Sequence, residues 1–127
     1  MSARISATIC DDFRREDSGK FIIVGGYSGG LGAFEFPVDD SFSCLLRGDS
    51  LPSDTKILTL FFRHVGYPME SKVLDVDGLE GDPFLFALPK IPVRAKSPGD
   101  FFIEVALDDG RKKKIEKLSI FDAREDS

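Results

Sequence analysis

The stretch that decides the fold class is 101-FFIEVALDDGRKKKIEKLSIF-121. Successive side chains of a strand point to opposite faces, so one face of an extended chain here carries the apolar residues Phe101, Ile103, Val105 and Leu107. Asp109-Gly110 follows, and Asp-Gly tolerates the positive φ angles of a short hairpin turn. The sequence therefore predicts a β-hairpin in which 101–107 pairs with 112–120.

Strand-like patterns also fill most of the preceding chain. Residues 3–10 alternate between apolar and polar, and 21–24 form a continuous β-branched run. Residues 55–63 place Leu58, Leu60 and Phe62 on one side, and shorter patterns cover 42–47, 71–76 and 84–88. Prolines and glycines separate these segments. Seven or eight such strands without a convincing helix predict an all-β antiparallel two-sheet sandwich, immunoglobulin-like or C2-like.

Length and composition fit one domain with a real core. The 127 residues are 42% hydrophobic and include 12 Phe, which is too apolar for a disordered chain. We expect residues 1–121 to form a single domain and 122–127 to form a charged tail. Seventeen basic against 22 acidic residues give a net charge of −5, which argues against a general nucleic-acid binder.

The N-terminal segment and the two cysteines together predict a cytoplasmic protein. Polar residues interrupt the N-terminal segment too often for a secretory signal. The longest uncharged run, 21–34, has 14 residues and is too short to span a membrane. Cys10 and Cys44 lie in apolar surroundings, and we interpret them as reduced core thiols. A disulfide between them is the less favoured alternative.

Local catalytic motifs are absent from the sequence. His64 is the only histidine and follows a strand pattern, so it is interpreted as a surface residue at a strand end. Nothing resembles a nucleophile elbow, and one histidine with two distant cysteines does not make an ordinary zinc site. The sequence therefore predicts a protein that is not an enzyme, with no catalytic residue, metal ligand or cofactor.

Pairs of acidic residues leave two alternative functions open, a calcium-binding domain and a metal-dependent hydrolase. Loops of a sandwich could gather carboxylates such as those of Asp75 and Asp77 into a calcium site, as C2 domains do. Scattered carboxylates holding a divalent ion could also serve a hydrolase. Asp before Gly, as in Asp77-Gly78, is equally ordinary turn chemistry, and we favour that interpretation.

A basic strip, 111-RKKKIEK-117, follows the predicted turn. No aromatic residue interleaves it, although stacking on single-stranded nucleic acid would require one. Lysines on an edge strand also discourage sheet-to-sheet aggregation. We therefore expect no nucleic-acid partner.

The N-terminal third carries a recognisable pattern: Ala7-x-x-Cys10-Asp11-Asp12, then Gly19-Lys20 before an apolar run ending in Gly25-Gly26-Tyr27, and later Phe36-Pro37. It resembles a bacterial family of small single-domain β-rich proteins of unknown function. The resemblance implies a cytoplasmic bacterial or phage-borne protein and assigns no catalytic residue. From the residues themselves, Asp11 and Asp12 are interpreted as carboxylates that cap a turn.

The glycine-rich segment 25-GGYSGGLG-32 lacks the spacing of a phosphate-binding loop and is interpreted as a flexible connection or bulge between strands. Its large apolar neighbours are unusual for a solvated loop and predict the partner-binding residues Tyr27, Leu31, Phe34 and Phe36. Alternatively, these side chains close one end of the core. The sequence thus predicts a non-enzymatic protein-interaction module of bacterial or phage origin. A homodimer through an edge strand is a further alternative.

Overall fold

The computed structural model describes residues 3–15, 21–26, 30–108 and 110–123, and for 11–15 and 21–26 it describes the backbone alone. The described residues form nine strands and no α-helix. The strands are β1 (Arg4–Arg15), β2 (Phe21–Gly26), β3 (Gly30–Ala33), β4 (Val38–Asp49), β5 (Ile57–Arg63), β6 (Glu70–Asp75), β7 (Phe84–Ala95), β8 (Gly99–Leu107) and β9 (Lys113–Asp122). The prediction of an all-β chain is confirmed.

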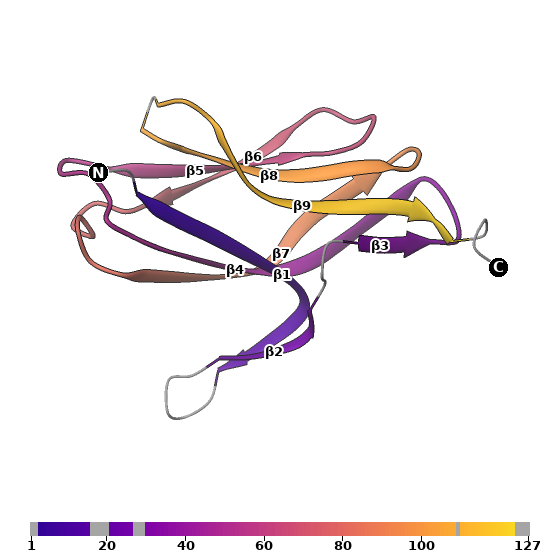
Figure 1. The fold of residues 1–127 in the computed structure, drawn as a ribbon, viewed down its shortest axis with the longest axis horizontal. Helices are drawn as coiled ribbons and strands as arrows, with labels where there is room; N and C mark the ends of the chain where they lie inside the picture. Colours follow the sequence, from indigo (N-terminus) through magenta and orange to yellow (C-terminus); the bar gives the residue numbers. More distant parts are fainter. Residues whose placement is uncertain (1–2, 16–20, 27–29, 109, 124–127) are drawn as a thin grey trace.

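The strands form two sheets, in the orders β2-β1-β4-β7 and β3-β9-β8-β5-β6 (Figure 1). Most neighbouring strands are antiparallel, but β3 runs parallel to β9. The prediction of a purely antiparallel sandwich was therefore wrong. The physical reason is that the chain crosses from β2 in one sheet to β3 at the far edge of the other, so the direction of β3 is not set by a hairpin.

Both sheets contribute to one apolar core. In β5 the predicted inward face is buried, with Leu58 and Leu60 at 0% exposure and Phe62 at 3%. The same alternation buries Phe101 and Ile103 in β8. The first sheet supplies the apolar side chains of Ile9, Cys44, Leu46, Ile91 and Val93. The period-two pattern thus sets which face of each strand packs against the other sheet.

The predicted hairpin is confirmed, but its turn is wider than expected. Val105 is the last residue of β8 that pairs with β9, and its partner is Lys113. Asp108 has a φ of 50°, and its carboxylate accepts the backbone N–H groups of Lys56 and Ile57, both at 3.0 Å. The loop is therefore anchored to the neighbouring strand β5, and the backbone N–H of Gly110 donates to the carbonyl oxygen of Leu107 at 2.8 Å.

Several strands extend beyond the predicted bounds. β7 continues through Pro89 and Pro92 to Ala95, with a register shift on its partner β4 between Phe42 and Cys44. The predicted strand, 84–88, ended before these prolines. They are tolerated because β7 is an edge strand, where a missing N–H does not break a ladder. At the C-terminus, β9 includes Asp122, the first residue of the predicted tail.

Candidate functional site

The structure separates the four residues that the sequence predicted for partner binding. Leu31 and Phe36 are partly buried and pack against the core. Phe34 is 70% exposed, the highest exposure among the exposed large hydrophobic side chains of the described residues. Tyr27 lies outside the described residues. For Leu31 and Phe36 the core contacts favour the alternative that they close one end of the core, whereas Phe34 is free to contact a partner.

Gly30–Ala33 forms strand β3, so the interpretation of this part of the segment as a flexible connection was wrong. The reason is the side chain of Phe121 in β9, which lies over the glycines. A Cβ atom on Gly32 would sit 3.0 Å from the Phe121 ring, and one on Gly30 would sit 3.5 Å from it. The glycines thus make room for the ring, which remains 43% exposed. We call Gly30–Phe34 together with Phe121 the β3 surface.

The sheet edges differ in how they are protected. β7 carries Pro89, Lys90 and Pro92, and proline or lysine on an edge discourages pairing with another chain. In β6, Glu70 and Lys72 pair with Phe62 and Leu60 and lie on the same face as buried Leu74, so both charges point inward. Inward-pointing charges are another known protection. Among the edge strands whose side chains are described, β3 alone contains neither charge nor proline.

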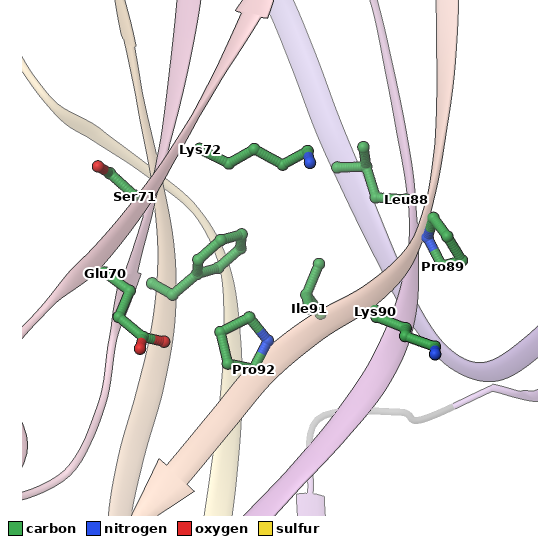
Figure 2. Close-up of a pocket in the computed structure, with 9 residues that line it drawn as sticks. Glu70, Ser71, Lys72, Leu88, Pro89, Lys90, Ile91 and Pro92 are labelled. Carbon is green, nitrogen blue, oxygen red and sulfur yellow. The ribbon is translucent and has the colours of Figure 1, made fainter.

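A groove separates the edge strands β6 and β7, and its volume is about 550 Å³ (Figure 2). It is lined by Phe62, Glu70, Ser71, Lys72, Leu88, Pro89, Lys90, Ile91 and Pro92. The floor is the flank of the core, because Phe62, Leu88 and Ile91 are almost fully buried. Figure 2 shows Lys72 extending across the groove toward Leu88, whereas Lys90 extends away from it.

His64 is buried beside this groove, so the prediction of a surface histidine was wrong. Its side chain has 0% exposure. Nδ1 accepts the backbone N–H of Arg94 at 3.1 Å, so Nε2 carries the proton and donates to Glu70 Oε2 at 2.9 Å. The ring also packs against Phe101, with centroids 5.7 Å apart. Partners from β6 and β7 satisfy both nitrogens and Phe101 of β8 packs against the ring, which gives this histidine a structural role.

Glu70 links this histidine to a surface ion-pair network. Its Oε1 lies 3.2 Å from Arg94 Nη1, and Arg94 Nε lies 3.2 Å from Asp39 Oδ1. Both carboxylate oxygens of Glu70 are therefore engaged. A second pocket, of about 500 Å³, adjoins this network and includes Asp40, Ser41 and Lys90.

The basic strip acquires aromatic neighbours through the sheet. Lys112 Nζ lies 4.5 Å from the ring centroid of Phe61, and Lys114 Nζ lies 4.1 Å from that of Phe102. Arg63 pairs with nearly buried Glu104 at 3.2 Å on the same sheet. The lysines thus cover half-buried rings of β5 and β8, an arrangement that accounts for their position without a nucleic acid.

The acidic motif adopts the turn that the sequence suggested. Asp75 Oδ1 accepts the backbone N–H of Asp77 at 3.0 Å, and Gly78 has a φ of 87°. Asp77 pairs with Lys56 at 3.0 Å. Within the described part of the chain, no three His, Cys, Asp or Glu side chains gather as metal ligands. The side chains of Asp11 and Asp12 lie outside the described residues.

The cysteines are free and buried, as predicted. Cys44 is paired with Ile9 and Cys10 with Ser43, so the two lie one register position apart on neighbouring strands. Burial, reinforced by the nearby Cys10 thiol, raises the pKa of Cys44 to about 12. The thiol of Cys44 is therefore protonated and unreactive at neutral pH.

Comparison of the chain with known protein families, with curated proteins and with solved structures finds no match. The resemblance of the N-terminal third to a bacterial family thus stays a prediction. Along the described residues, no helix is both long and apolar enough to cross a lipid bilayer.

Proposed function

We propose that the protein is a non-enzymatic interaction module that binds an extended segment of a partner protein along β3. The observation that carries this proposal is the edge itself: β3 ends the five-stranded sheet, contains no charge or proline, and leads directly into exposed Phe34. Adding a strand to an exposed sheet edge is a recurring mode of peptide binding, in which backbone hydrogen bonds give affinity and side-chain contacts give specificity.

The aromatic side chains at β3 suit this mode. Phe34 and Phe121 offer large apolar anchors at 70% and 43% exposure, and the Phe121 ring lies in the space that Gly30 and Gly32 leave. The proposal includes a bacterial or phage origin, a cytoplasmic setting and a sandwich of the immunoglobulin-like or C2-like type. The occupant is a partner protein, and β3 of a second copy is the alternative.

The test compares the wild type with Phe34→Ser and with a matched control, Val73→Ser, which removes a 60% exposed apolar side chain from β6. A partner that co-purifies with the wild type and with Val73→Ser, but not with Phe34→Ser, supports the proposal. Hydrogen exchange in the purified complex should then be slowed at Gly30–Ala33. Equal capture by both variants, or unchanged exchange at β3, contradicts it. Wild-type protein that sediments as a dimer, with exchange slowed at β3, identifies a second copy as the occupant.

A further inference from the structure

The groove between β6 and β7 holds a cation with no anion to neutralise it. Lys72 extends across the groove (Figure 2), and among the described residues its ammonium group has no hydrogen-bond or ion-pair partner. The carboxylate in the groove, that of Glu70, is already engaged by His64 at 2.9 Å and Arg94 at 3.2 Å. Lys72 therefore supplies a positive charge in the groove that is not paired with a carboxylate of the described residues.

The surfaces beneath this charge are apolar. Leu88, Pro89, Ile91 and Pro92 form one wall, and Phe62 contributes from the opposite sheet. A volume of about 550 Å³ lies within the usual range of small-molecule sites, which combine an apolar lining with a few placed polar groups. The chemistry that fits is an apolar body carrying one negative charge.

A peptide strand fits the same groove poorly. Pro89 and Pro92 lack backbone N–H groups, so β7 offers an incomplete row of donors. Opposite it, the inward charges of Glu70 and Lys72 protect the edge of β6. A small ligand needs neither backbone ladder.

We propose that the β6–β7 groove binds a small carboxylic acid with an apolar body, whose carboxylate pairs with the Lys72 ammonium group and whose apolar part lies against Pro89 and Pro92. This site is independent of the proposed partner site, because β6 and β3 are opposite edges of the five-stranded sheet. The Lys72 stem already crosses the groove, so the ligand binds beside it and orders the ammonium group.

Octanoate is the probe, and 1-octanol is the matched ligand without a charge. Binding is followed in the full-length protein by NMR titration of the methyl signals of Leu88 and Ile91, and by calorimetry. The protein variants are Lys72→Met, which keeps an apolar stem without the charge, and Lys90→Met, which removes the lysine that extends away from the groove. Lys72 is exposed, so the variant should fold as the wild type does.

We expect saturable one-to-one binding of octanoate, roughly threefold to fivefold tighter than 1-octanol, which corresponds to one pair of solvent-exposed charges. Lys72→Met should remove this advantage, whereas Lys90→Met should change it less than about twofold. Titrations without saturation, equal binding of acid and alcohol to the wild type, or an unchanged preference in Lys72→Met each overturn the proposal. None of these outcomes bears on partner binding by β3, which Phe34→Ser tests separately.

Discussion

At Gly48, strand β4 lies very close to both of its neighbours, β1 and β7, and Gly48→Ala should therefore destabilise the fold. A Cβ atom there would lie 2.7 Å from the carbonyl oxygen of Arg4 in β1 and 2.7 Å from Cζ of Phe84 in β7. Ordinary contact begins at 3.4 Å, so the strands must open by about 0.7 Å. Overpacking of this kind costs about 1–3 kcal/mol, partly offset by a gain of about 0.4–1 kcal/mol from the stiffer unfolded chain.

The net loss of about 1–2 kcal/mol should lower the Tm by roughly 4–8 °C in a domain of this size. Gly30→Ala is the matched control, because its Cβ would meet nothing closer than 3.5 Å. It should raise the Tm by roughly 2–4 °C through the unfolded chain alone. Differential scanning calorimetry measures both. A Gly48→Ala protein as stable as Gly30→Ala would refute the close approach of β1 and β7 at Gly48.

Four further outcomes follow from the described contacts. Leu31→Ser should lower the free energy of unfolding by about 1–2 kcal/mol because Leu31 packs on the core, whereas Phe34→Ser should change it by less than about 0.5 kcal/mol; urea unfolding of both distinguishes them. His64→Ala should cost about 2–4 kcal/mol in the same assay, since it leaves a cavity and a buried Arg94 N–H without its acceptor, and a loss below about 1 kcal/mol would contradict the buried network. Cys44 should resist a thiol reagent in the native protein at pH 8 and react once the protein is unfolded. Its pKa is about 12 in the folded protein but 9.0 in the unfolded chain, so only the unfolded thiol ionises just above pH 9.0 and the free energy of unfolding falls as the pH rises further. Hydrogen bonds from the backbone N–H groups of Ile57 and Lys56 lower the pKa of Asp108, so the ionised carboxylate stabilises the fold above pH 3.8, its pKa in the unfolded chain, and this stabilisation is lost as the pH falls below that value. The difference in unfolding free energy between wild type and Asp108→Asn should therefore become smaller in acid, and a difference that grows would contradict these hydrogen bonds.

The period-two pattern was sufficient to predict the core strands but not their edges. Leu58, Leu60 and Phe62 lie two residues apart, and burial of one face follows directly from strand geometry. The predicted strand 84–88 covers only the first part of β7. The alternation of Ile91, Val93 and Ala95 beyond it was the available signal, since all three are buried.

Features that depend on contacts between distant segments were not predictable in the same way. β3 has two glycines and no apolar alternation, and its partner β9 lies about 90 residues along the chain, so no local pattern marks it. His64 is buried by Glu70, Arg94 and Phe101, which come from three other strands. A solitary histidine followed by valine gives no hint of these partners, because burial of a polar ring depends on where its hydrogen-bond partners fold.

Both proposed sites follow from one property of the five-stranded sheet: one edge strand, β6, carries charged side chains, whereas the other, β3, carries neither charge nor proline. At β6, inward Lys72 keeps other strands away, and the same ammonium group gives the groove a charge that a small carboxylate can neutralise. At β3, glycines accommodate the Phe121 ring, and the strand therefore lacks the side chains that usually protect an edge. An unprotected edge beside exposed Phe34 is an aggregation risk for a free monomer unless a partner covers it. Under the two proposals, the chemistry of each edge selects its own class of ligand, a backbone at β3 and a small anion at β6.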